Sequence, residues 1–180
     1  MNTFMLILCI IIIVGLLAII YVATFNRFQD YIIRINEAEV NIDASLRKRY
    51  DLVNKAASII EANINEEVKI QEVVNQLRSQ KLTNFELDRN LYDAINEFHV
   101  IKEKHPEFQT NEEFIKIELG LVESESEIVG LRKYYNDIIT DYNKLVKSFP
   151  SNIVSILNGY KTKEYFDGNS IDQKKGAVKL

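Results

Sequence analysis

Two histidines, several serines and one cysteine are the residues of this 180-residue chain that could do metal or nucleophilic chemistry. Helical bundles often hold metal through Glu-x-x-His pairs, in which both ligands face the same side of one helix. Here Asn96 and Lys102 stand three residues before His99 and His105, so neither histidine has that partner. We therefore expect both histidines on a solvated helix surface or in a loop.

The serines and glycines are equally poor candidates for chemistry. No serine stands in a strained elbow with a base and an orienting group that can be named. The sequence has no Gly-rich phosphate loop, and Gly120 and Gly130 are predicted to allow close helix packing. The acidic run ESESE, from Glu123 to Glu127, is typical of a solvated helix face. We expect no catalytic residue, no cofactor and no metal site, and hence no enzyme.

The polar aromatics are concentrated in the stretch YYNDIITDYNKLVKSFP, from Tyr134 to Pro150. This stretch continues a series of positions that advances alternately by three and four residues along one predicted helix. The series is Phe114, Ile117, Leu121, Ser124, Ile128, Leu131, Tyr135, Ile138, Tyr142, Leu145 and Phe149. A seam with this 3.5-residue period is typical of coiled coils. It predicts that Tyr135 and Tyr142 lie inside a helical bundle.

A second seam follows the amino-terminal apolar run, and two charged residues interrupt it. It consists of Phe28, Ile32, Ile35, Glu39, Ile42, Leu46, Arg49, Val53, Ala56 and Ile60. A charge on an inward stripe is costly unless it is paired or reaches the surface along its stem. Glu39 and Arg49 lie about 15 Å apart along the axis, so each needs a partner from another helix. For Arg49 we expect a polar layer near 132–136, with Asp137 or Tyr135 as the acceptor.

Capping chemistry predicts where the helices begin. The side chain of an N-cap residue accepts a backbone N–H, and a glutamate three residues later reaches back. Three pairs have this spacing: Asn63 with Glu66, Thr83 with Glu86, and Thr110 with Glu113. The predicted helical segments are 27–62, 66–80, 84–104 and 111–149, although 66–104 could be one bent helix. Pro106 separates the last two segments.

An amino-terminal membrane anchor is predicted because the run from Phe4 to Phe25 is almost wholly apolar and the first charged residue is Arg27. At about 1.5 Å per residue the run reaches about 33 Å, against roughly 30 Å of hydrocarbon core. It lacks the basic start and the small-residue cleavage site of a secretory signal. Cys9, the only cysteine, lies inside the run and is expected to face lipid or to pack.

The orientation of the anchor depends on the basic residues beside it. Arg27 and Arg34 follow the span, and no basic residue precedes it. The positive-inside rule therefore favours a cytoplasmic bundle, with an extracytoplasmic bundle as the alternative because the bias is only two arginines.

The fold class expected is all-α: a transmembrane helix that continues into an antiparallel bundle of long helices with four helical segments. The domains expected are a transmembrane anchor over 4–25, a bundle over 26–150, a short helix or extension over 151–166 and a disordered tail over 167–180. The tail has too little apolar surface to offset the entropy of ordering. The net charge of −4 is a poor basis for nucleic-acid binding, and we expect none.

Two runs resemble the LemA family of bacterial membrane-associated helical proteins. They are NIDASLRKRYDLV, from Asn41 to Val53, and HPEFQTNEEFIKIE to YYNDIITDYNKLVKSFPSN, from His105 to Asn152. The resemblance implies a membrane helix followed by an antiparallel bundle, usually of four helices, and no catalytic residue. The structural or interaction candidates that it carries over are Asp43, Arg49, Asp51, Tyr135, Asn136, Tyr142, Asn143, Phe149 and Pro150; Leu46 and Tyr50 also match.

Two departures from the family pattern concern the first helix. The family often has alanine-tryptophan where this chain has Ala38-Glu39, and proline-asparagine where it has Val53-Asn54. The core near the anchor is therefore expected to be looser. The missing proline predicts a straighter helix, because proline removes a helix hydrogen bond.

The function expected is that of a structural or adaptor protein in the bacterial cell membrane, held through residues 4–25, whose bundle presents a helical surface to an unknown protein partner. The alternative is an accessory of membrane stress signalling that senses a small ligand or a metal. Glu39, Arg49 and Ser124 are the inward polar residues that could line a cavity for it. The partner, the oligomeric state and the biological process stay open.

Overall fold

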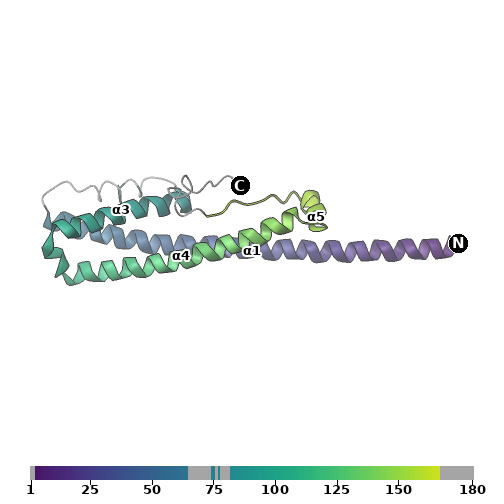
Figure 1. The fold of residues 1–180 in the computed structure, drawn as a ribbon, viewed down its shortest axis with the longest axis horizontal. Coiled ribbons are helices and arrows are strands. Elements are labelled where there is room, and N and C mark those ends of the chain that lie inside the picture. Colours follow the sequence, from purple (N-terminus) through teal and green to yellow (C-terminus); the bar gives the residue numbers. More distant parts are fainter. Residues whose placement is uncertain (1–2, 65–73, 76, 78–81, 167–180) are drawn as a thin grey trace, which may run out of the picture. The chain divides into compact units, whose positions relative to one another are not determined.

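The computed structural model describes residues 3–64, 74, 75, 77 and 82–166 (Figure 1). The described elements, in chain order, are α1 (Thr3–Asn63), α3 (Asn84–Lys104), the 3₁₀ helix η1 (Pro106–Gln109), α4 (Glu112–Lys147) and α5 (Ser151–Asn158). The described residues contain no strand. The all-α prediction is therefore confirmed. Of the predicted segment 66–80 only Val74, Asn75 and Leu77 are described, all helical, so the choice between one bent helix and two lies outside the described residues.

The anchor and the first bundle segment form one uninterrupted helix, α1, of 61 residues. Every described side chain from Thr3 to Ala23 is exposed, including the thiol of Cys9. Among the described helices, α1 is the one long and apolar enough to cross a membrane, by length and composition. The helix also continues without a break past Val53, where no proline interrupts its hydrogen bonds.

The capping prediction is confirmed at one helix start and wrong at another. At α3 the Glu86 backbone N–H donates to Thr83 Oγ1 over 3.3 Å, and Glu86 Oε2 accepts from the Thr83 backbone over 2.9 Å. At α4 the N-cap is Asn111, whose Oδ1 accepts from the Phe114 backbone over 3.0 Å. Thr110 instead donates to the Glu107 carbonyl, because it closes the 3₁₀ turn that precedes α4.

Among the described residues, one compact unit comprises those in 38–134 together with Phe166. Within it, α4 runs antiparallel to both α1 and α3, as predicted. On α3 and α4, Lys102 pairs with Glu118 while Asp88 pairs with Arg132. The aromatic core at one end of this unit is a stack in which the rings of Phe98 and Phe108 lie 4.4 and 4.7 Å from the ring of Phe114. Such offset aromatic contacts add specific geometry to apolar burial.

The other unit comprises residues 1–37 and 135–165. Phe28 of α1 is fully buried there, and its ring lies 5.9 Å from that of Tyr142 and 4.5 Å from that of Tyr160. Tyr135 and Tyr142 are both buried, which confirms the bundle-interior prediction. The residues expected to form one bundle, 26–150, thus fall in two compact units. The expected tail 167–180 lies outside the described residues.

The α4 seam is correct except at its end. All its members are buried apart from the half-buried Leu131 and from Phe149, which is 80% exposed. Sequence reasoning extended the helix to 149, but α4 ends at Lys147. Pro150 explains the difference, because it disfavours a helical conformation of the preceding residue. The same reasoning placed Glu39 on an inward stripe, and the structure exposes it.

Candidate functional site

Four charged side chains from three helices form a cluster, which we call the charge cluster: Arg49 of α1, Asp88 of α3, and Glu125 and Arg132 of α4. The side chains of Arg49 and Asp88 are only 4% and 2% exposed. Arg49 pairs with Asp88 over 3.9 Å between Nη1 and Oδ1 and makes a closer pair with Glu125. Arg132 pairs with the same oxygen of Asp88. The cluster therefore holds two cations and two anions.

Among the described residues, the carboxylates that pair with Arg49 do not include the expected Asp137. Asp137 is exposed, and the carboxylates that contact Arg49 are Asp88 and Glu125. A sequence signal for Asp88 existed, since it is buried on the face of α3 that also buries Leu91, Ile95 and Phe98, at the same spacing of three and four residues. A carboxylate on such a stripe needs a cation just as an arginine needs an anion.

Burial governs the electrostatics of Asp88. Loss of water raises the pKa of its carboxyl above the ordinary value, while the guanidiniums of Arg132 and Arg49 oppose that rise. The nearby Glu125 adds to it. Arginine keeps its proton in proteins, so both cations of the cluster stay charged. The cluster links three helices through its ion pairs.

The remaining inward polar residues do not converge on a cavity. Ser124 is buried, but its hydroxyl donates to the Leu121 carbonyl of the same helix over 2.8 Å. Glu39 is exposed, and its carbonyl accepts from the Asn84 amide over 3.2 Å.

The family-derived candidates divide between the two units. In residues 38–134, Asp43 pairs with Arg47 of the same helix over 2.7 Å, and Asp51 is exposed. In residues 135–165, Asn143 makes two hydrogen bonds of 2.8 Å to the backbone of Lys163. The other candidates there are the buried Tyr135 and Tyr142, the half-buried Asn136, and the exposed Phe149 and Pro150. Most of these residues have packing or hydrogen-bonding roles.

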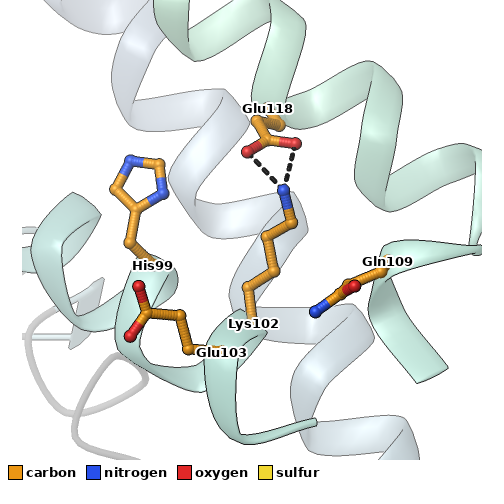
Figure 2. Close-up of a pocket in the computed structure, with 5 residues that line it drawn as sticks. All are labelled: His99, Lys102, Glu103, Gln109 and Glu118. Carbon is orange, nitrogen blue, oxygen red and sulfur yellow. Dashed lines mark hydrogen bonds and ion pairs between the residues drawn. The ribbon is translucent and has the colours of Figure 1, made fainter. Parts of the chain in front are cut away.

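A hollow of about 570 Å³ lies beside the end of α3 (Figure 2). Its lining is His99, Lys102 and Glu103 of α3, Gln109 of η1 and Glu118 of α4. Figure 2 shows Lys102 reaching toward Glu118, and its Nζ lies 2.6 and 2.7 Å from the two carboxylate oxygens. The described residues contain no group of three or more metal-ligating side chains. Lys102, the lysine that lines the hollow, is already neutralised by Glu118 of the same protein.

The histidines occupy the places expected for them. His99 is exposed on α3. His105 lies between α3 and η1, half-buried, with its Nδ1 3.0 Å from Glu107 Oε1.

An exposed apolar stripe on α4 was missed by sequence reasoning. We call it the outer stripe, and its members are Ile115, Leu119, Val122 and Val129, with Ser126 between the last two. At about 100° per residue these positions lie within an arc of about 80° on the helix, opposite the buried seam. Its positions follow the same spacing of three and four residues as the buried seam, and this spacing could have identified the stripe from the sequence. Leu119 and Val122 are 65% and 63% exposed.

The comparison with protein families produced one match. The family model described as the LemA family matches residues 38–180, more than half of the chain. A comparison with curated proteins found no match.

Proposed function

Because the chain belongs to the LemA family, we propose that it is a single-pass membrane protein with an adaptor role, whose outer stripe on α4 binds a helix of a protein partner. The bundle faces the cytoplasm in this proposal, and the role is not enzymatic. The exposed apolar stripe is the observation that carries it. Solvent exposure of large aliphatic side chains at a regular helical spacing is typical of helix-in-groove and coiled-coil partners.

The anchoring half of the proposal is supported by α1. Its side chains from Thr3 to Ala23 are exposed, and the same helix then supplies buried core residues such as Phe28 and Leu46. A helix that is exposed and apolar on all sides is stable when lipid surrounds it. Protease accessibility of the carboxyl-terminal residues in intact cells tests the orientation. Protection of these residues supports a cytoplasmic bundle, and cleavage supports the extracytoplasmic alternative.

Energetics indicate what the partner must bring. Full burial of an exposed aliphatic side chain contributes about 1.5–3 kcal/mol. The four aliphatic members are only 37–65% exposed, so together they contribute less than about 6–12 kcal/mol. Association itself costs about 4–15 kcal/mol. The stripe therefore needs help from flanking groups. Glu112 and Glu123 lie beside it, exposed and each 4.0 Å from a lysine, Lys116 and Lys48 respectively. Such exposed pairs contribute little, so an apolar helix flanked by lysine or arginine could replace them.

Site-specific photo-crosslinking in intact membranes tests the partner. A crosslinker at Leu119 is expected to capture one protein reproducibly, and Val122→Glu, one turn away, is expected to abolish the adduct. Val40→Glu is the matched control, because Val40 is 67% exposed on α1 in the same unit and is not part of the stripe. Repeated absence of an adduct at Leu119, or equal loss with both glutamate variants, contradicts the adaptor proposal.

The alternative is a ligand- or metal-sensing accessory in membrane stress signalling. It has less support, because Ser124 is bonded within its own helix and Arg49 is paired within the charge cluster. A thermal-shift screen of metals and metabolites on the full chain in detergent discriminates the two. A true ligand at 100 times its Kd stabilises by about 2.7 kcal/mol, whereas the adaptor proposal expects no shift.

A further inference from the structure

Helix α5 is amphipathic in the inverted sense, with its serines inside and its large aliphatic side chains outside. Ser151 and Ser155 are buried, and their hydroxyls donate to the carbonyls of Leu145 and Val146 in α4 over 2.6 and 3.2 Å. Five large apolar residues line the segment from 149 to 157. Only Val154 of these is buried, while Phe149, Ile153, Ile156 and Leu157 are exposed. Water is a poor solvent for such a surface.

The end of α5 contacts the apolar run of α1 directly. The side chain of Asn158 hydrogen-bonds the hydroxyl of Tyr21, with Nδ2 donating over 3.2 Å. Further along both segments, the side chain of Gln29 donates to the hydroxyl of Tyr160 over 2.7 Å. Two successive contacts therefore hold α5 and the following residues against α1 within one compact unit.

We propose that α5 is a membrane-interface helix, whose exposed side chains Ile153, Ile156 and Leu157 lie, with Phe149 just before the helix, among the lipids at the boundary between headgroups and acyl chains. The inference rests on the proposed function, since it requires α1 to span the bilayer. Tyr21 lies about 6 Å along the helix axis from Phe25, the last residue of the apolar run. Interfacial helices bury their apolar face about 5–10 Å into this boundary. The Asn158 contact thus places α5 at the matching depth.

The aromatic and basic residues around α5 are those of a membrane interface. Tyr21 and Phe25 stack with ring centroids 6.3 Å apart, and aromatic side chains concentrate at this level of the bilayer. A cleft of about 460 Å³ adjoins Phe149, and its charged lining residues are Arg27, Asp141 and Lys144, of which the last two form an exposed pair over 3.5 Å. Cations beside the inserted side chains can contact lipid phosphates. These features identify the bilayer surface as the occupant of the apolar face of α5.

The test uses tryptophan as a depth reporter, because the natural chain contains none. Leu157→Trp, in the full chain reconstituted in nanodiscs, is measured with lipids brominated along the acyl chain. Tyr21→Trp reports the span itself. Leu119→Trp is the matched exposed control on α4, since Leu119 and Leu157 are 65% and 69% exposed.

Quenching of Leu157→Trp to an extent similar to that of Tyr21→Trp, with a blue-shifted emission and an unquenched Leu119→Trp, supports the proposal. Unquenched, water-exposed emission from Leu157→Trp beside a quenched Tyr21→Trp overturns it. An unquenched Tyr21→Trp instead overturns the membrane span, and with it the proposed function. Quenching of Leu119→Trp equal to that of Leu157→Trp also overturns the proposal, because contact with lipid would then not be specific to α5. Ile156→Trp repeats the measurement one residue away.

Discussion

Asn143 of α4 binds both backbone groups of Lys163: its Nδ2 donates to the carbonyl oxygen, and its Oδ1 accepts from the N–H, each over 2.8 Å. Lys163 follows α5 without belonging to a helix, so its backbone groups have no helical partners. One amide side chain thus satisfies the two backbone groups that a helix or sheet would otherwise pair. This explains why an asparagine, which carries one donor and one acceptor side by side, stands at this position.

Replacing Asn143 by aspartate is expected to release the segment from 159 to 165, because a carboxylate cannot donate to the Lys163 carbonyl. A buried group that loses its hydrogen bond costs about 1–3 kcal/mol. Hydrogen exchange of this segment measures the effect. Asn54→Asp, at an exposed position of α1, is the control, and exchange at Lys163 is expected to stay slow in that variant. Unchanged protection in Asn143→Asp contradicts the assignment.

Arg49→Met is expected to destabilise the unit of residues 38–134 by about 3 kcal/mol, because it removes one of the two cations paired with the buried carboxylate of Asp88. Arg47→Met is the matched control. Arg47 pairs with Asp43 at the surface, with its side chain 75% exposed, and surface pairs contribute at most about 1 kcal/mol. Denaturant unfolding followed by hydrogen exchange of α3 measures both. Equal losses for the two variants contradict a structural role for the charge cluster.

The pH dependence of stability is expected to report Asp88. Its native pKa lies above the ordinary value of 3.8, so the native state holds the proton more tightly than the unfolded state. Its contribution is therefore fully present below the unfolded pKa and is lost as pH rises through the native pKa. The difference in unfolding free energy between the natural chain and Asp88→Asn isolates this term. That difference should fall as pH rises from about 3.8, and a rise would show that the two arginines outweigh burial.

Alanine substitutions at the helix starts test which residues act as N-caps, those observed in the structure or those with the expected sequence spacing. Thr83→Ala and Asn111→Ala are each expected to cost about 1 kcal/mol, because each removes the acceptor of a helix N-terminal N–H. Thr110→Ala should cost less, although Thr110 has the sequence spacing of a cap. Unfolding of each alanine variant by urea gives the ranking. A larger loss for Thr110→Ala than for Asn111→Ala contradicts the observed cap.

The sequence by itself determined the helical class, the apolar run and the buried seams. Periodicity and capping are local: a step of three or four residues places Tyr135 and Tyr142 on one face whatever that face meets. The same rule predicted that Arg49 lies inside. It failed where the chain leaves the helix, at Phe149, since the spacing continues through a position that Pro150 withdraws from the helix.

Only the tertiary structure decided which partners these faces meet. Asp88 and Arg49 are 39 positions apart in the chain, and no periodicity relates residues on separate helices. Their pairing depends on the register between α1, α3 and α4, which is set by packing of the whole interface. Only the tertiary structure likewise decided that the aliphatic faces of α4 and α5 point outward. A spacing marks a stripe as apolar, but only the packed structure shows whether protein covers it.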